Sequence, residues 1–269
     1  METAMFEKIT PEKAADYLEK NTKRNRKVAN RRVHLFARDM ASGRWVSNGE
    51  PIIFDKSGEL IDGQHRLLAI IEAGIPVKML VVRGVPKKAF ETIDQGSSRT
   101  LAVVLGSTGV QASSARAACT FDKTGSVEIA ARARAEHKPT TAELVEWYTA
   151  NEDTLQSYVL QYGRLRRVVG KLSSVATIVA LRAADLRGIN IDGFVDDLCS
   201  ALTPGATQRA CVFAKVVSRY DMAGHEGRIK TAQLLLWLAD CYEKNYEPAR
   251  DRARYFDVSK FDRYGKLPL

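Results

Sequence analysis

The chain has 269 residues, with 41 lysines and arginines against 32 aspartates and glutamates, so its formal net charge at pH 7 is +9. That length is enough to bury a full hydrophobic core without covalent staples. The 4 cysteines are scattered without a C-x-x-C pair, which argues against a disulfide framework or a zinc site and favours a reducing compartment. The sequence has no signal-peptide pattern and no apolar run near the ~18 residues of a membrane span, so we expect a cytoplasmic protein with no membrane partner.

Two helices are expected in the first forty residues. Thr10, Pro11 and Glu12 form a helix start, because threonine caps, proline fits the first helical position and the acid favours the positive end of the helix dipole. A second helix is predicted over 28–42, where apolar residues recur at helical spacing, and Gly43 ends it.

The second helix lies in a strongly basic stretch. Residues 20–44 contain nine lysines and arginines and a single acid, Asp39. Such a run is typical of a surface that faces a polyanion, or of a helix face that is simply solvated. For the first case the residues expected to bind DNA are Arg24, Arg31, Arg32 and Arg38. Some cations in this run could instead turn inward towards nucleotide phosphates.

A hairpin, a tight turn and a helix follow, and this is the most informative part of the sequence. An apolar strand at 51–54 leads through a turn at 55–58 into a second short strand. Asp62 and Gly63 then open a helix that Gly74 ends. A turn of this kind directs unpaired amide groups and the positive end of the helix dipole to one place, which predicts a phosphate site.

The residues of this turn suggest how phosphate would be held. Gly63 would let the backbone amides of Gln64 and His65 approach the oxygens, and Arg66 would make paired hydrogen bonds to them. His65 stands in the first turn of the helix, where it could also touch a phosphate.

The pattern continues with a strand at 77–82 and a short helix at 89–93. The helix leads into the polar segment Asp94-Gln95-Gly96-Ser97-Ser98-Arg99, and Thr100 can cap a helix at 101–105. The pattern weakens over 106–125, where 122–125 is expected to form a loop.

The rest of the chain is expected to be helical. Thr140 and Glu143 form a capping box, and helical spacing recurs near 153–169, 173–187, 192–202, 207–220 and 228–245. We therefore predict an α+β protein with a small mixed sheet and helices in residues 1–108, followed by a helical domain in residues 109–269.

The sequence Asp62-Gly63-Gln64-His65-Arg66, the upstream Asn25-Arg26 pair and the order of elements over 20–105 resemble the ParB/sulfiredoxin superfamily. The likeness is to ParB amino-terminal domains of the DGQHR-motif branch, which is common in phages and mobile elements. It implies that the motif turn binds the triphosphate of ATP or CTP, with Mg²⁺ as cofactor. The nucleotide-binding residues so implied are Asn25, Arg26, Asp62, Gly63, Gln64, His65, Arg66 and Arg99.

The chain departs from the family pattern in three places. Gln64 stands where sulfiredoxins carry a catalytic cysteine, so sulfinic-acid reduction is not expected. His65-Arg66 replaces the Arg-Arg of ParB, so a preference for CTP is not carried over. The segment from Asp94 to Arg99 is one residue longer than its ParB counterpart. The resemblance then implies Asp94 as a ligand of Mg²⁺ and, together with His65, as a catalytic residue.

The leading hypothesis is a Mg²⁺-dependent nucleotide hydrolase that acts at DNA in a bacterial or phage-infected cell, and that could form a homodimer. A second hypothesis is a kinase of the same fold acting on a small hydroxyl compound or a nucleobase, with Asp62, Glu59 or Asp94 as base. A third is a DNA-binding module without catalysis. A metal-dependent nuclease is less expected, because no cluster of carboxylates surrounds the motif.

Overall fold

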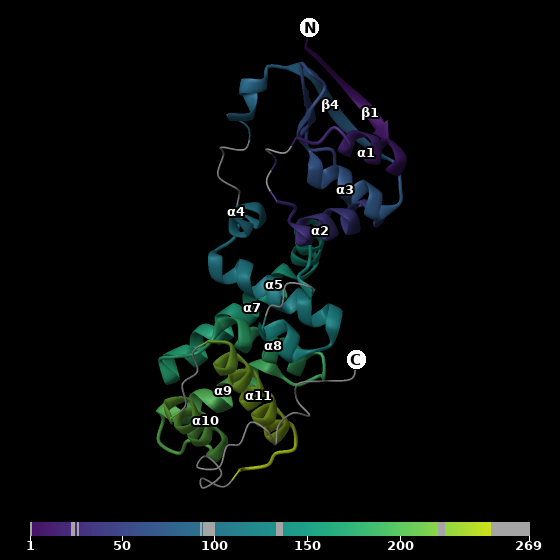
Figure 1. The fold of residues 1–269 in the computed structure, drawn as a ribbon. Coiled ribbons are helices and arrows are strands. Elements are labelled where there is room, and N and C mark those ends of the chain that lie inside the picture. Colours follow the sequence, from purple (N-terminus) through teal and green to yellow (C-terminus); the bar gives the residue numbers. More distant parts are fainter. Residues whose placement is uncertain are drawn as a thin grey trace. The chain divides into compact units, whose positions relative to one another are not determined.

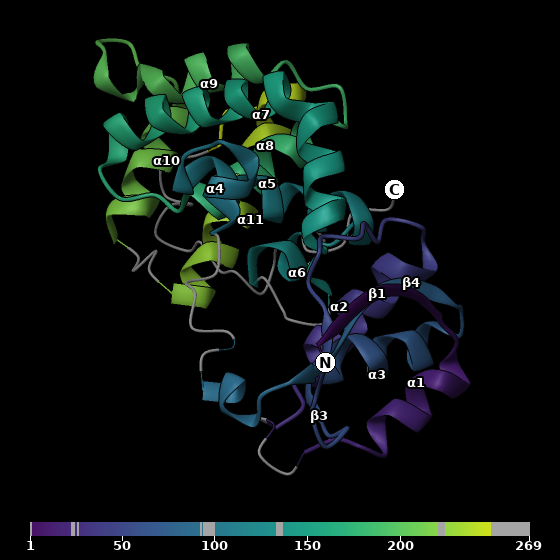
Figure 2. The same cartoon turned by 90° about the horizontal axis from the view of Figure 1, so that it is seen from above.

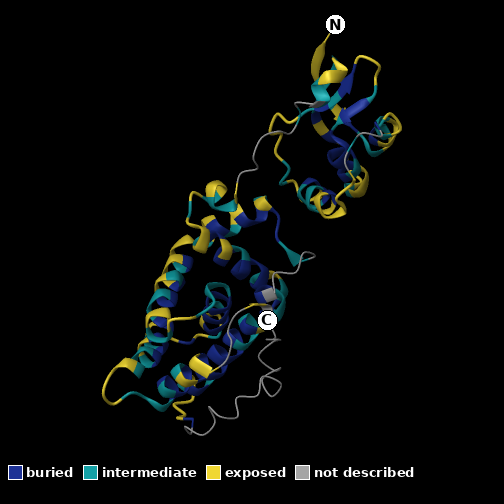
Figure 3. Ribbon diagram, turned by 60° about the vertical axis from the view of Figure 1, so that its left-hand side comes forward, coloured by how far each residue is buried: buried dark blue, intermediate teal, exposed yellow. Residues whose placement is uncertain are grey.

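The computed structural model describes residues 2–22, 25, 27–91, 93, 100–132, 137–219 and 224–248. The chain is α+β, with a sheet and helices in the first part and helices alone in the described residues of the second (Figure 1). Two compact units divide between Arg99 and Thr100, and each has buried residues of its own, drawn dark blue on the ribbon (Figure 3). The expected boundary after residue 108 lies one short helix, α4 (Leu101–Leu105), beyond this division.

The first unit is built on a four-stranded sheet, counted over the described residues, with strand order β1-β4-β2-β3. β1 (Thr3–Ile9) runs antiparallel to β4 (Val77–Val85). β2 (Ile52–Asp55) runs parallel to β4 and antiparallel to β3 (Leu60–Asp62). The hairpin β2-β3 and the strand β4 agree with the sequence prediction, although β4 extends to Val85.

β1 is a strand that we did not expect from the sequence. It forms one edge of the sheet, where Phe6 pairs with Leu80 and Ile9 with Val77. Only Ile9 is buried, and the Met5 and Phe6 side chains are each 54% exposed. Its pattern therefore lacks the alternation of a half-buried strand, which is the signal that would have identified it.

The helices of the first unit are α1 (Pro11–Leu18), α2 (Asn30–Ala41) and α3 (Gln64–Ala73), with a 3₁₀ turn η1 at Lys87–Glu91. Thr10 caps α1 as expected, since its hydroxyl accepts a hydrogen bond from the amide of Lys13 at 3.2 Å. α3 packs against both α1 and α2, and their apolar faces meet the sheet in one buried cluster.

The second unit contains α4 to α11 and a 3₁₀ turn η3. Besides α4 these are α5 (Gly109–Thr124), α6 (Val127–Arg132), α7 (Thr141–Val169), α8 (Ser174–Asp185), α9 (Ile191–Cys199), η3 (Ser200–Leu202), α10 (Gln208–Arg219) and α11 (Gly224–Glu243). α5, α7 and α11 pack around α8, whose alanines and aliphatic residues are buried on nearly every side (Figure 2). The capping box of Thr140 and Glu143 opens α7 as expected.

The loop expected at 122–125 is wrong, because α5 continues to Thr124 and Gly125 ends it. Asp122 lies inside the helix, and its carboxylate accepts hydrogen bonds from Arg182 of α8 and from the indole of Trp147 in α7. Interhelical contacts therefore override the local loop signal. None of the helices in the described part of the chain is both long and apolar enough to span a membrane.

Candidate functional site

The motif turn is shaped by Gly63, which stands between β3 and α3 with φ +106°. A Cβ at this position would lie 2.9 Å from Ile52 Cγ1 and 3.1 Å from Ile52 Cα. The Gly63 amide donates to the carboxylate of Asp62 at 2.7 Å. The glycine is therefore required by its backbone conformation and by close packing on β2, in addition to any approach of a ligand.

Gln64 links the motif to the upstream segment that the sequence also singled out. The Gln64 side-chain oxygen accepts a hydrogen bond from Asn21 Nδ2 at 3.2 Å. Asn25 Nδ2 in turn donates to Asn21 Oδ1 at 2.6 Å and to the Leu60 carbonyl at 3.1 Å. The structure thus brings Asn25 and Gln64 into one hydrogen-bonded chain, although they are far apart in sequence.

His65 is buried and joins α3 to the start of α2. Its Nε2 accepts a hydrogen bond from the backbone amide of Ala29 at 3.0 Å. With Nε2 as acceptor, the ring proton is placed on Nδ1. The expected catalytic role of His65 would have to compete with this contact, which fixes the first residue before α2.

The contacts of these two helices show that α2 and α3 run in the same direction. Ala29 meets His65 at the beginning of both helices, whereas His34 meets Glu72 further along, with Nδ1 and Oε1 2.7 Å apart. Neither helix has an acidic residue in its first turn. Two helix dipoles therefore present their positive ends side by side, which favours an anion at this position.

Arg66 is also buried, and the structure gives its guanidinium partners inside the unit. Nη1 bonds to the Glu50 carboxylate at 2.8 Å, and Nη2 bonds to the Pro51 carbonyl at 2.6 Å and to the Asp62 carboxylate at 3.0 Å. Direct contact of Arg66 with phosphate stays a prediction, since the hydrogen bonds that its guanidinium donates here go to these three protein groups. Its charge is already compensated by two carboxylates, and its main effect is to tie α3 to the residues that precede β2.

The expected DNA-binding residues separate into two groups. Arg31 and Arg32 are exposed in the first turn of α2, and neither has an ion pair with another described residue. Arg38 is half-buried near the other end of the helix. Four expected site residues, Arg24, Arg26, Asp94 and Arg99, lie outside the residues that the structure describes.

The described residues do not fit a magnesium site around the motif. No group of three or more histidine, cysteine or acidic side chains among them is arranged to hold a metal ion. Asp62, the carboxylate of the motif, is already bonded to Arg66 and to the Gly63 amide. Asp94 is the expected ligand and lies outside the described range, so we derive no reaction step through Mg²⁺.

A second polar cluster joins β1, α1 and β4. The Glu7 carboxylate accepts hydrogen bonds from Arg83 and from the Tyr17 hydroxyl, the latter at 2.7 Å, and pairs with Lys13 at 2.8 Å. Arg83 also donates to the Tyr17 hydroxyl at 2.6 Å. Burial alone would raise the pKa of Glu7, but the hydrogen bonds from Arg83, Lys13 and Tyr17 outweigh it and lower the pKa to about 2.

Sequence reasoning missed the residues that hold the motif in place, above all Glu50, Asn21 and Ala29. Glu50 could have been suspected, because it stands two residues before the first residue of the strand that pairs with the motif strand. The Ala29 contact is made by a backbone amide, for which no side-chain pattern exists. Comparison of the chain with protein-family models, with curated proteins and with solved structures gives no match.

Proposed function

We propose that this protein binds a nucleotide at the adjoining amino ends of α2 and α3, and that it acts at DNA. The observation that carries the proposal is the hydrogen bond from the Ala29 amide to His65 Nε2. It holds the amino ends of two helices together, and neither first turn contains an acidic residue, although the Asp62 carboxylate lies at the amino end of α3, bonded to Gly63 and Arg66. A polyphosphate is the ligand class that matches such a site.

The surroundings of this site support an anion as well. Arg31 and Arg32 project from the first turn of α2 without ion pairs among the described residues, and Lys27 is exposed just before it. Asn25 is held beside the motif by its bond to the Leu60 carbonyl. In this arrangement phosphate contacts come from backbone amides and surface cations, while Arg66 stabilises the turn beneath them.

The sharpest test places a negative charge at the proposed site without disturbing the fold. Asn30→Asp adds a carboxylate in the first turn of α2, which favours the helix but repels phosphate. We expect it to weaken nucleotide binding roughly tenfold or more in a calorimetric titration with ATP, CTP, ADP and GTP, with and without Mg²⁺. Ser42→Asp adds the same charge at the exposed opposite end of α2 and is the control.

Two results would contradict this part of the proposal. One is wild-type protein that binds none of the four nucleotides, and the other is equal affinity in Asn30→Asp and wild type. If a nucleotide binds, release of phosphate is measured in the same samples. The hydrolysis expected from the sequence stays a separate prediction, namely slow Mg²⁺-dependent release that Asp94→Ala suppresses more strongly than it weakens binding.

DNA binding without a nucleotide is the second candidate, and it is favoured by Arg31 and Arg32, which have no ion pair with another described residue. In that case affinity for duplex DNA falls steeply with salt, because each neutralised phosphate releases counterions. Charge reversal at both positions should flatten the slope. DNA retention that does not depend on salt would remove these two residues from any DNA interface.

A further inference from the structure

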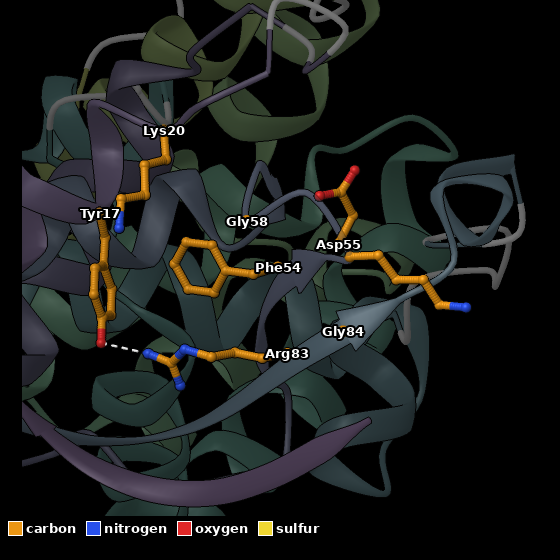
Figure 4. Close-up of a pocket in the computed structure, with 8 residues that line it drawn as sticks. Tyr17, Lys20, Phe54, Asp55, Gly58, Arg83 and Gly84 are labelled. Carbon is orange, nitrogen blue, oxygen red and sulfur yellow. Dashed lines mark hydrogen bonds between the residues drawn. The ribbon is translucent and has the colours of Figure 1, made fainter. Parts of the chain in front are cut away.

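A cavity of about 240 Å³ lies at the carboxyl end of β2 and close to that of β4 (Figure 4). It is lined by Tyr17, Lys20, Phe54, Asp55, Lys56, Gly58, Arg83 and Gly84. The motif turn lies at the other end of β2, because Gly63 packs on Ile52, the first residue of that strand. The cavity is therefore a separate place from the nucleotide site proposed above.

One side of the cavity is aromatic. The rings of Tyr17 and Phe54 meet edge to face, with their centroids 4.9 Å apart at 78°. The Arg83 guanidinium lies over both, at 5.5 Å from the Tyr17 centroid and 5.2 Å from that of Phe54 (Figure 4). Gly58 leaves open space beside these rings, since a Cβ there would have no neighbour within 4 Å. Phe54 is only 3% exposed, so the ring that a ligand could pack on is that of the half-buried Tyr17.

The charges around the cavity leave a positive excess. The Asp55 carboxylate is occupied by its own turn, where it accepts hydrogen bonds from the amides of Ser57 and Glu59 and from the Ser57 hydroxyl. The positive charge of Arg83 is compensated by its ion pair with Glu7. Lys20 and Lys56 are exposed at the rim, and neither has an ion pair with another described residue.

We propose that this cavity binds a small organic anion, whose flat ring packs on Tyr17 while the positive charge of the exposed Lys20 and Lys56 attracts its carboxylate or phosphate. The volume is slightly below the ~300 Å³ lower limit of typical small-molecule pockets, which suits a single ring with one acidic group. Arg83 uses two of its five N–H groups on Glu7 and Tyr17, so it can donate further hydrogen bonds to the anion.

The test measures separately what the ring and the negative charge of a ligand contribute to binding. Full-length protein is titrated with benzoate, phenyl phosphate, benzyl alcohol and inorganic phosphate, and amide shifts are followed by NMR. We expect benzoate or phenyl phosphate to bind roughly tenfold more tightly than either benzyl alcohol or inorganic phosphate, with the largest shifts at Gly58 and Gly84. The better of the two ring anions identifies the acidic group as carboxylate or phosphate.

Variants test whether Lys20 and Lys56 contribute to binding of the anion. The double variant Lys20→Gln, Lys56→Gln should bind the ring anion roughly tenfold more weakly than wild type, without a lower melting temperature. The matched control is Lys8→Gln with Lys78→Gln, because these exposed lysines face each other across β1 and β4 outside the cavity. Unchanged binding in the first pair, or equal binding of benzyl alcohol and benzoate, overturns the proposal. Asn30→Asp should leave this binding unchanged, which keeps the two proposals distinguishable.

Discussion

The two units of the chain bury their polar side chains in different ways. In the first unit Gln64, His65 and Arg66 are consecutive, all buried, and all at the amino end of one helix. In the second unit the buried polar residues are dispersed, and charged pairs such as Arg209 with Asp197 join one helix to another.

The two arrangements of buried polar groups have different structural roles. A dispersed pair between helices fixes how two elements pack, and its loss affects mainly that contact. Three consecutive polar residues in one turn each reach a different neighbour, at Asn21, Ala29 and Glu50, so the turn organises its whole surroundings. Buried polar groups concentrated at one helix end are typical of a functional site, whereas the helical unit has at such a position the pair Thr140 and Glu143, which cap α7.

The largest expected effect comes from breaking a buried pair of the second unit. Arg209 and Asp197 side chains are 7% and 8% exposed, and Arg209 Nε and Nη2 bond to the two carboxylate oxygens at 2.8 and 2.9 Å. Arg209→Ala leaves the acid buried alone, so we expect a loss of roughly 3–5 kcal/mol in the free energy of unfolding. Urea denaturation measures it, and hydrogen exchange should localise the loss to residues 100–248.

The control for this variant is an exposed pair in the same unit. Arg164 pairs with Asp196, whose side chain is 63% exposed. Because solvent screens such pairs, Arg164→Ala should change stability by about 1 kcal/mol or less. Equal losses of stability in Arg209→Ala and Arg164→Ala would contradict the expectation that the buried pair stabilises the fold more than the exposed pair.

An intermediate effect is expected at the motif turn. Gly63→Ala combines a strained backbone at φ +106° with a Cβ placed 2.9 Å from Ile52, and should destabilise the first unit by about 3 kcal/mol. At Gly74, with φ +68°, a Cβ would have no neighbour within 4 Å. Gly74→Ala should therefore lower the free energy of unfolding by about 1 kcal/mol, through backbone strain alone. Hydrogen exchange should show the larger loss of protection throughout 2–91, and a smaller effect at Gly63 than at Gly74 would contradict the close packing on β2.

The smallest expected effect is a loss of stability at low pH that Glu7 confers on the first unit. Since its pKa falls from 4.5 to about 2 on folding, Glu7 contributes stability that is complete above pH 4.5 and is lost as the pH falls towards 2. After screening by solvent we expect this loss to be about 1–2 kcal/mol and to affect the first unit. Thermal melts from pH 2 to 6 measure it.

Glu7→Gln is the variant that tests this dependence on pH. It should be less stable than wild type at pH 6 but should approach wild type near pH 2, because the neutral amide carries no charge to lose. Glu19→Gln, at an exposed acid of the same unit, serves as control. A parallel fall of the wild type and Glu7→Gln would assign the acid sensitivity to other groups.

Much of the fold follows from local signals in the sequence. The cap at Thr10, the capping box at Thr140, and the hairpin that precedes Gly63 are determined by neighbouring residues, and the structure has all three. β1 could not be recognised, because an exposed edge strand lacks periodic burial. Asp122 looked like a loop residue because its partners, Arg182 and Trp147, come from helices elsewhere in the chain.

The candidate site was predicted less completely than the fold around it. The sequence singled out the motif turn and Asn25 separately, and the structure joins them through Asn21. The role of Arg66 could not be foreseen, because it depends on Glu50 and on the Pro51 carbonyl. Whether an arginine faces a ligand or a neighbouring carboxylate depends on which acid the tertiary structure brings to it.

The pairing of β1 with β4 has a consequence for the order of events during synthesis. β1 is made before the other described strands of its unit, but its neighbour in the described sheet is β4, the last of those strands. Until Val77–Val85 has been made, Met5 and Phe6 belong to an unpaired apolar segment, which is prone to association with other chains. The sheet of this unit therefore cannot be completed before β4 has been made, by which time β2, β3 and α3 have already been synthesised.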